Sequence, residues 1–148
     1  MKSVTVIGDG TVKPSSHLYK VAVEVGRLIA RKGYALICGG MLGVMEGACR
    51  GAKEEGGLTV GILPGYDWSS NPYVDIKIPT GLGHGRNVIV AASSPVVVAV
   101  GGSYGTLSEI AFALKLKRKV IGYSSWDVKG IENYEEVSSF LRAVDSSI

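Results

Sequence analysis

Residues 95–106 read PVVVAVGGSYGT, and this stretch decides the fold class of the chain. Its first six residues form an uninterrupted apolar run, as expected of a central strand that is covered on both faces of a parallel sheet. Two glycines follow, and from Leu107 onward apolar side chains recur at helical spacing. A buried strand, a glycine-rich loop and a helix in this order are typical of the ligand-binding edge of an α/β domain.

Short strands and amphipathic helices alternate along the rest of the chain. Residues 74–78 alternate apolar and polar side chains, which predicts a half-exposed strand near an edge of the sheet. The predicted strands cover residues 3–8, 34–38, 58–63, 74–78, 95–100 and 120–123. The predicted helices lie around residues 18–29, 45–52, 85–94, 107–114 and 134–144. The sequence therefore predicts one Rossmann-like α/β domain over residues 1–148, with a doubly wound parallel sheet of about six strands and helices on both faces.

The composition excludes several classes of protein. Hydrophobic residues make up 46% of the chain, enough for a packed core, and the formal net charge of +3 is spread along it. This charge is too weak to predict binding to nucleic acid or to a membrane, and no apolar stretch approaches the ~20 residues of a membrane-spanning helix. Cys38 and Cys49 lack CxxC spacing and no signal peptide precedes the first strand, so we expect a cytoplasmic protein with reduced, structural thiols.

Glycine is the outlier of the composition, with 21 residues, and it concentrates in the loops that follow the predicted strands. Those loops share the carboxyl edge of the sheet, where ligands of open α/β domains bind. Glycine lets backbone N–H groups approach a phosphate closely, and a helix that starts there favours an anion. The predicted phosphate- or nucleotide-binding residues are Gly8, Asp9, Gly39, Gly40, Gly43, Glu46, Asn87, Gly101, Gly102, Ser103, Tyr104, Gly105 and Thr106.

Some residues at this edge also have a simple structural interpretation. Thr106 and Glu109 have the spacing of a capping box, which satisfies N–H groups at a helix start and is compatible with a ligand-binding role. Glu46 precedes Arg50 by four residues, so an ordinary ion pair along a helix is the slightly favoured alternative to a site role. Arg86 either lies in a solvated first turn or faces a phosphate or a developing negative charge.

Several kinds of chemistry lack their sequence motif. His17 and His84 are isolated and no HExxH or Cys–His cluster occurs, so we predict no metal site. Residues 8–10 (GDG) lack the third glycine of the dinucleotide fingerprint, and no acidic residue ends the second strand at Cys38, which disfavours a nicotinamide dehydrogenase. The GxxxxGK[ST] and GxSxG patterns are also absent. We expect no cofactor.

Two ordered motifs resemble those of the Lonely Guy (LOG) superfamily. Residues 39–52 (GGMLGVMEGACRGA) are similar to its GGGPGxMEAANRGA stretch, and residues 101–109 (GGSYGTLSE) are similar to its PGGxGTxxE motif. This superfamily, formerly described as possible lysine decarboxylases, includes cytokinin riboside 5′-monophosphate phosphoribohydrolases and molybdenum cofactor carrier proteins. Residues 86–94 look closer to the carrier-like branch, and Val100 and Ser108 depart from the hydrolase pattern. Both activities therefore remain open.

The resemblance implies a site and two alternative functions. The glycines and the threonine of residues 101–106 would hold the 5′-phosphate of a nucleotide, and the catalytic residues Arg86 and Glu109 would flank its ribose and glycosidic bond. A phosphoribohydrolase would split a nucleoside 5′-monophosphate into free base and ribose 5-phosphate through an oxocarbenium-like state. The alternative is a non-catalytic carrier or sensor of the molybdenum cofactor or a related nucleotide. The resemblance also implies a homo-oligomer, a dimer or larger, with a small nucleotide or phosphorylated pterin as its partner.

An aromatic loop leaves the same edge of the predicted sheet. Residues 64–73 follow the third strand and carry Tyr66, Trp68 and Tyr73. Three aromatic side chains so close together suit stacking on a flat ligand, so we expect this loop to cover the base or pterin ring. Packing against a neighbouring subunit explains these side chains about as well.

Overall fold

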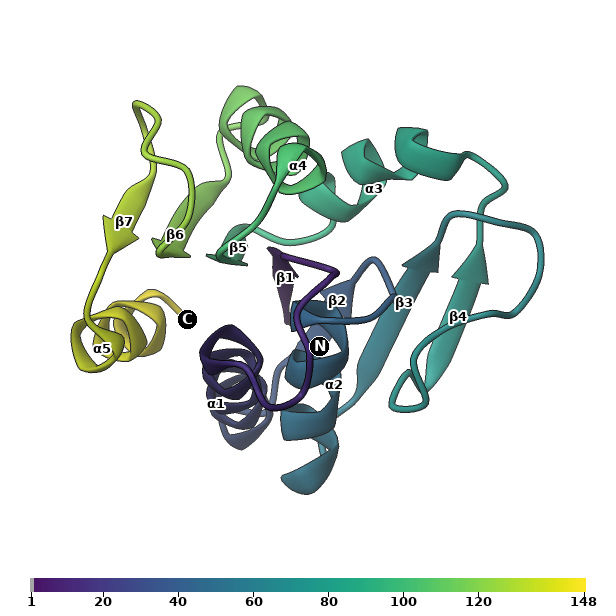
Figure 1. Cartoon of the computed structure of the whole chain (residues 1–148), viewed down its shortest axis with the longest axis horizontal. Coiled ribbons are helices and arrows are strands. Elements are labelled where there is room, and N and C mark those ends of the chain that lie inside the picture. The colour runs from purple at the N-terminus through teal and green to yellow at the C-terminus, as the bar shows by residue number, and fades with distance from the viewer. Residues whose placement is uncertain (1) are drawn as a thin grey trace.

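The strands are β1 (Ser3–Gly8), β2 (Ala35–Cys38), β3 (Thr59–Leu63), β4 (Ile76–Pro79), β5 (Val96–Val100), β6 (Lys119–Tyr123) and β7 (Glu132–Tyr134). The helices are α1 (His17–Arg31), α2 (Val44–Glu54), α3 (Asn87–Ala92), α4 (Tyr104–Lys115) and α5 (Val137–Ser147), and a short 3-10 helix, η1 (Gly83–Arg86), precedes α3. The computed structural model describes residues 2–148. All strands are parallel and form one sheet in the order β4-β3-β2-β1-β5-β6-β7 (Figure 1). The predicted doubly wound parallel α/β fold is confirmed, with seven strands where about six were expected.

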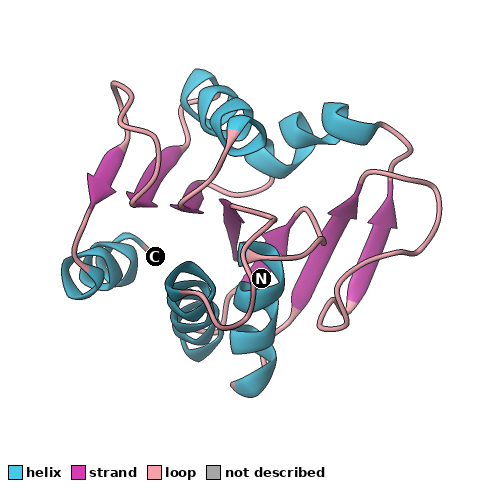
Figure 2. Ribbon diagram, in the orientation of Figure 1, coloured by secondary structure: helices cyan, strands magenta, loops and turns pink. Residues whose placement is uncertain are grey.

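Helices cover both faces of the sheet (Figure 2). α1, α2 and α5 lie on one face, and α3 and α4 lie on the other. The chain runs outward from β1 through β2, β3 and β4, then returns to β5 on the other side of β1. The strand order therefore reverses between β1 and β5, and in open α/β sheets ligands bind outside the carboxyl ends of the strands at such a reversal. Among residues 2–148, no helix combines the length and the apolar character needed to cross a membrane.

Apolar side chains form a core layer on each face of the sheet. Val98 belongs with Val25 and Phe140 to the layer under α1, α2 and α5, whereas Val97 belongs with Ile110 to the layer under α3 and α4. Every residue of β5 is buried, as its uninterrupted apolar sequence predicts. The central strand therefore gives a rigid base to the loop that follows it.

The structure differs from the predicted elements mainly at the β7 edge. β7 was missed because its three residues carry no apolar run, and the helix expected over residues 134–144 begins only at Val137. Parallel pairing with β6 holds the strand, and the Asn133 side chain accepts from the Ser125 N–H and donates to the Ser125 carbonyl, both at 3.1 Å. The helix predicted over residues 85–94 is divided into η1 and α3. The half-exposed strand, β4, lies at an edge as predicted.

Candidate functional site

The loops after β1, β2 and β5 interlock at the carboxyl edge of the sheet. The Asp9 N–H donates to the Val100 carbonyl at 3.3 Å, and the Asp9 carbonyl accepts from the Val44 N–H at 2.9 Å. The Asp9 carboxylate is hydrogen-bonded within its own turn, because it accepts from the N–H and the hydroxyl of Thr11 at 2.8 and 2.6 Å. Within the loop after β2, the Gly40 carbonyl accepts from the Asn71 N–H at 2.8 Å. Asp9 and Gly40 therefore shape the edge of the site through their own hydrogen bonds.

The loop after β5 leads directly into the N-terminus of α4. Gly101 and Gly102 have φ angles of +58° and +121°, and a Cβ on Gly102 would lie 2.4 Å from the Cβ of Thr106. The first bond that returns from the helix to the loop runs from the Leu107 N–H to the Ser103 carbonyl at 3.0 Å. The three preceding N–H groups thus have no acceptor within the helix, and the N-cap residue Ser103 makes no side-chain capping bond. Free N–H groups at the positive end of a helix dipole favour an anion.

The capping-box interpretation of Thr106 and Glu109 is wrong. α4 begins at Tyr104 with Ser103 as its N-cap, so Thr106 is already the third residue of the helix. Both side chains are buried, with 3% of Thr106 and 9% of Glu109 exposed. Their spacing places them on the face of α4 that turns toward the sheet, where they do not cap the helix.

Arg86 brings a buried positive charge to this edge. Its Nη1 donates to the Asn87 side-chain oxygen at 2.6 Å and its Nη2 donates to the Gly39 carbonyl at 3.4 Å. The buried Nε has no hydrogen-bond partner among the described residues, and only 8% of Arg86 is exposed. Burial lowers the pKa of Arg86, because a guanidinium removed from water loses hydration that its neighbours here replace only in part. A buried cation with a free donor is suited to an anionic ligand.

Glu109 lies close enough to Arg86 for their charges to interact, but no ion pair joins them among residues 2–148. Burial raises the pKa of Glu109 to about 7, and the Arg86 charge opposes this rise. A carboxyl group that titrates near neutral pH can exchange a proton under physiological conditions, as a general acid or base must. The structure thus brings the two predicted catalytic residues to one edge with their charges unpaired.

Glu46 is hydrogen-bonded to α1. Its carboxylate accepts from the hydroxyl of Tyr19 on α1 at 2.6 Å. The predicted ion pair between Glu46 and Arg50 does not form among the described residues, and Arg50 instead contacts Glu54 at 3.4 Å. The i,i+4 pair is therefore one turn further along α2 than expected.

The whole chain is similar to a known protein family. The model of the SLOG cluster4 family matches residues 1–147. The chain belongs to this family. The expected membership of the LOG superfamily is confirmed by this match and by the similarity to a cytokinin riboside 5′-monophosphate phosphoribohydrolase, described next.

Two relatives match most of this chain in sequence. An uncharacterized protein of Archaeoglobus fulgidus is 48% identical over 120 residues, which cover 81% of this chain and 78% of the relative. The cytokinin riboside 5′-monophosphate phosphoribohydrolase of Mycobacterium tuberculosis is 30% identical over 118 residues, which cover 72% of this chain and 63% of the enzyme. The SLOG cluster4 protein therefore spans less than two thirds of the length of that enzyme.

Solved structures extend the similarity over nearly the entire chain. The molybdenum cofactor binding protein of Rippkaea orientalis is 36% identical with a TM-score of 0.87, and the alignment covers 99% of this chain and 98% of that one. The molybdenum cofactor carrier protein of Chlamydomonas reinhardtii is 37% identical with a TM-score of 0.86, again covering 99% and 98% of the two chains. The fold of the SLOG cluster4 protein is thus that of known small-molecule-binding proteins.

A pocket opens beside the N-terminus of α4 in this SLOG cluster4 protein. Its volume is about 310 Å³, and it is lined by His84, Asn87, Tyr104, Gly105 and Ser108. The Asn87 amide donates to the Ser108 hydroxyl at 3.0 Å and thereby joins α3 to α4. His84 and Ser108 were not predicted to line this pocket, although His84 precedes Arg86 and Ser108 lies within the motif of residues 101–109.

Trp126 also lies beside this pocket without having been predicted as a site residue. Its indole stacks on the Tyr104 ring with the centroids 5.9 Å apart and the planes inclined by 30°. It follows β6, so the rule that ligands bind at the carboxyl ends of strands could have drawn attention to it. The apolar run of residues 120–123 predicts only the strand and gives no signal for the residues that follow it.

The aromatic loop at residues 64–73 is only partly available to a ligand. The Tyr66 ring rests on Gly81, since a Cβ there would lie 2.1 Å from the ring, and 64% of Trp68 is exposed. Tyr73 packs against the core under α1 and α2. One of the three aromatic side chains is therefore structural, and the covering role of the other two stays a prediction.

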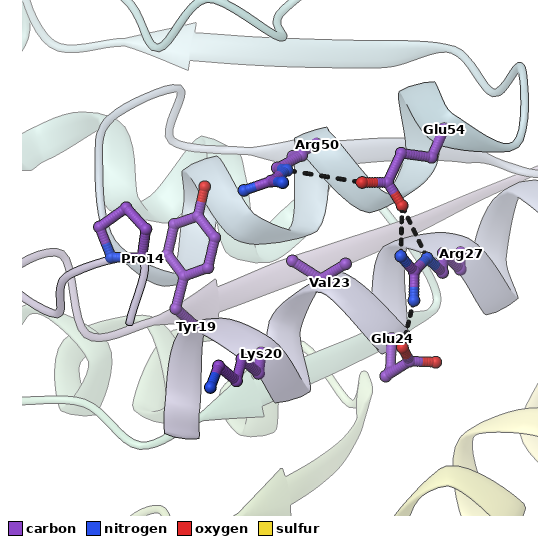
Figure 3. A pocket seen from close by; sticks show the side chains of 8 residues that line it. All are labelled: Pro14, Tyr19, Lys20, Val23, Glu24, Arg27, Arg50 and Glu54. Atoms are coloured by element: carbon purple, nitrogen blue, oxygen red, sulfur yellow. Dashed lines mark hydrogen bonds and ion pairs between the residues drawn. The ribbon is translucent and has the colours of Figure 1, made fainter. Parts of the chain in front are cut away.

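A larger pocket, of about 410 Å³, lies between α1 and α2 (Figure 3). It is lined by Pro14, Tyr19, Lys20, Val23, Glu24, Arg27, Arg50 and Glu54. Figure 3 shows that Arg27 lies between Glu24 and Glu54, and that Glu54 also reaches Arg50. None of the predicted phosphate-binding residues lines this pocket.

Neither histidine belongs to a metal-binding cluster. Within residues 2–148, no group of three or more His, Cys, Asp or Glu side chains could hold a metal ion. The His17 Nε2 is instead 2.7 Å from the Tyr123 hydroxyl, and Cys38 and Cys49 are free and buried. Their sulfur atoms lie 3.5 Å apart. These side chains take part in packing and local hydrogen bonds.

Proposed function

We propose that this protein binds a phosphorylated, nucleotide-type ligand at the carboxyl edge of the sheet. The buried Nε of Arg86, which has no partner among the described residues, carries this proposal. η1, which carries Arg86, and the start of α4 both lie at the carboxyl edge, so Arg86 and the free N–H groups of α4 would serve one anion together. The phosphate would lie on residues 101–106, with Arg86 beside it. The relatives named above, which by name act on a nucleoside 5′-monophosphate or bind the molybdenum cofactor, support this class of ligand.

Hydrolysis of an N-glycosidic bond is the activity that Glu109 supports. Its pKa of about 7 leaves a substantial ionised fraction at neutral pH, and a carboxylate near the ribose would stabilise an oxocarbenium-like state or orient the attacking water. Arg86 would stabilise negative charge that develops on the leaving side. The products would be a free base and ribose 5-phosphate. Both residues reach this edge from different elements, η1 and α4.

A carrier or sensor without catalysis is the second candidate. The two molybdenum cofactor proteins named above are 36% and 37% identical to this chain, and their alignments cover 99% of it. Ser108 also stands where the hydrolase pattern often has a first glutamate, and its hydroxyl is used in bonds to Asn87 and Gly105. The same phosphate site would then retain its ligand without cleaving it.

Incubation with nucleoside 5′-monophosphates separates the two candidates. The purified protein is mixed with each of the common nucleoside 5′-monophosphates, and chromatography measures the free base. Hydrolysis predicts release that falls by roughly 10²–10⁴-fold in Glu109→Gln, because the general acid or base is lost. Binding of the same nucleotides without any release would support the carrier, and the absence of both binding and release would overturn the proposal.

A homo-oligomer is part of the same proposal. Val88 and Ile89 of α3, Phe112 of α4 and Leu116, which directly follows α4, are large apolar side chains that remain exposed, and the two helices pack against each other. Exposed apolar patches of this kind mark interaction surfaces. Sedimentation equilibrium should give a mass of at least twice that of one chain, and Phe112→Lys should lower it; a monomeric wild type would contradict this part of the proposal.

A further inference from the structure

We infer that the flat ring of the bound ligand stacks on Tyr104, in the pocket beside the N-terminus of α4. This inference rests on the proposed function, because it places the ring relative to a phosphate on residues 101–106. Tyr104 is the first residue of α4 and belongs to the phosphate loop, yet 80% of it is exposed. An aromatic ring so exposed next to a ligand site is suited to stack on a second flat ring.

Trp126 holds the Tyr104 ring in place from behind. The indole supports one side of Tyr104, with centroids 5.9 Å apart. The indole Nε1 donates to the Ser103 carbonyl at 3.0 Å, and the neighbouring Ser125 hydroxyl donates to the Gly101 carbonyl at 2.7 Å. The segment after β6 is therefore fastened to the phosphate loop at two points. A stacking surface fixed to the loop that holds the phosphate loses little conformational freedom on binding, so its stacking energy is retained.

The pocket beside Tyr104 has the size and the polar groups that a heteroaromatic ring requires. About 310 Å³ is enough for one nucleobase or pterin, and small-molecule pockets of this kind start near ~300 Å³. Its lining also includes the polar side chains of His84, Asn87 and Ser108, of which Asn87 and Ser108 are already hydrogen-bonded to each other. Gly105 also lines it, so the ring and the phosphate would share one end of α4.

The aromatic loop after β3 is worse placed to receive the same ring. β3 is separated from β5 by β2 and β1, so its end lies about 14 Å from the phosphate loop at ~4.8 Å per strand. Tyr104 is part of that loop. We therefore assign the ring to Tyr104 in preference to Tyr66 and Trp68.

Calorimetric titration tests the stacking role with two probes. Adenosine 5′-monophosphate carries the ring, and ribose 5-phosphate lacks it. All variants are made on a Glu109→Gln background so that the nucleotide stays intact. Tyr104→Ala should lower the affinity for adenosine 5′-monophosphate by about 5–150-fold, the equivalent of ~1–3 kcal/mol of base stacking. The affinity for ribose 5-phosphate should change by less than about 2-fold. Tyr104→Phe keeps the ring and should bind both probes like the parent.

A fluorescence measurement locates the ring independently. The chain has two tryptophans, so in Trp68→Leu the emission comes from Trp126 alone. Adenosine 5′-monophosphate should still change this emission, and its affinity should be that of the parent. The inference is overturned if Trp68→Leu abolishes the change, if Tyr104→Ala leaves nucleotide affinity intact, or if Tyr104→Ala weakens both probes equally. Failure of the parent to bind either probe would overturn the proposed function as well.

Discussion

The pocket between α1 and α2 and the carboxyl edge of the sheet differ in whether their charged side chains form ion pairs. In the pocket between α1 and α2, Arg27 contacts Glu24 and Glu54, and Glu54 also contacts Arg50 (Figure 3). At the carboxyl edge, Arg86 is buried with a free Nε and makes no ion pair among residues 2–148. The pocket beside the N-terminus of α4 is nevertheless smaller than the pocket between α1 and α2, about 310 against 410 Å³. Unpaired buried charge, more than volume, therefore distinguishes the site from a groove between packed helices.

The physical reason lies in the cost of burial. Exposed ion pairs contribute little, typically ~0.2–1 kcal/mol, and need no further partner. A buried charge without a partner costs several times more, and such groups persist where a ligand or a reaction uses them. Three predictions below run from the largest expected effect on binding or stability to the smallest, and a comparison of two arginines then tests the contrast directly.

Gly105→Val should abolish binding of ribose 5-phosphate and leave the fold intact. A Cβ at Gly105 meets no atom within 4 Å and the residue is helical, so the side chain fits the protein but blocks the approach of an anion to the N–H groups of α4. Valine also has a higher helix propensity than glycine, so the melting temperature should not fall. Calorimetry and thermal unfolding measure the two quantities; Gly105→Ala should give an intermediate affinity. Unchanged affinity in both variants would contradict a phosphate at this helix.

Glu109→Gln should alter the pH dependence of stability. Burial raises the pKa of Glu109 from 4.5 to about 7, so between these values the folded protein binds more protons than the unfolded chain. The free energy of unfolding of the wild type therefore falls as the pH rises through this range, by up to about 3 kcal/mol at ~1.4 kcal/mol per pKa unit. The variant lacks this loss and should be the more stable protein at pH 8, with little difference at pH 4. Urea unfolding at pH 4 and at pH 8 measures the difference in the free energy of unfolding between the two proteins. A variant that is less stable at pH 8 would mean that Arg86 holds Glu109 ionised.

The sequence predicts the fold well because local patterns and burial agree along most of the chain. The apolar run of β5, the glycines that follow it and the stripe on α4 all require a parallel α/β sheet. β7 could not be predicted in the same way, since its pairing with β6 depends on backbone hydrogen bonds and on Asn133 rather than on an apolar pattern.

The site is less predictable than the fold. The glycine-rich loops mark the correct edge, and the family motif supplies Arg86 and Glu109. Whether a carboxylate caps a helix, pairs with a neighbour or stays free depends on where the helix begins and on which elements pack nearby. Thr106 proved to be the third residue of α4, and Glu46 bonds Tyr19 across α1 and α2. Such contacts between distant segments carry no signal in local spacing.

Arg27→Gln, within the paired network of Figure 3, should have the smallest effect on binding and only a modest effect on stability. Arg27 is about one third exposed and contacts Glu24 and Glu54, so its loss should cost no more than the ~1 kcal/mol typical of exposed pairs, and less at high salt. Ribose 5-phosphate should bind as in the wild type. A large loss of affinity would show that the pocket between α1 and α2, rather than the carboxyl edge, receives the ligand.

The most direct test of the account compares two arginines that lose the same charge. Ribose 5-phosphate is titrated into the wild type, Arg86→Gln and Arg50→Gln, and each melting temperature is recorded. Arg86→Gln should bind about 10–150-fold more weakly, the equivalent of a charged hydrogen bond worth ~1.5–3 kcal/mol, without a lower melting temperature, because a buried cation with a free donor is removed. Arg50→Gln should bind within about 2-fold of the wild type. Equal affinities for all three proteins, or a loss confined to Arg50→Gln, would contradict the claim that Arg86 and the N-terminus of α4 hold the phosphate.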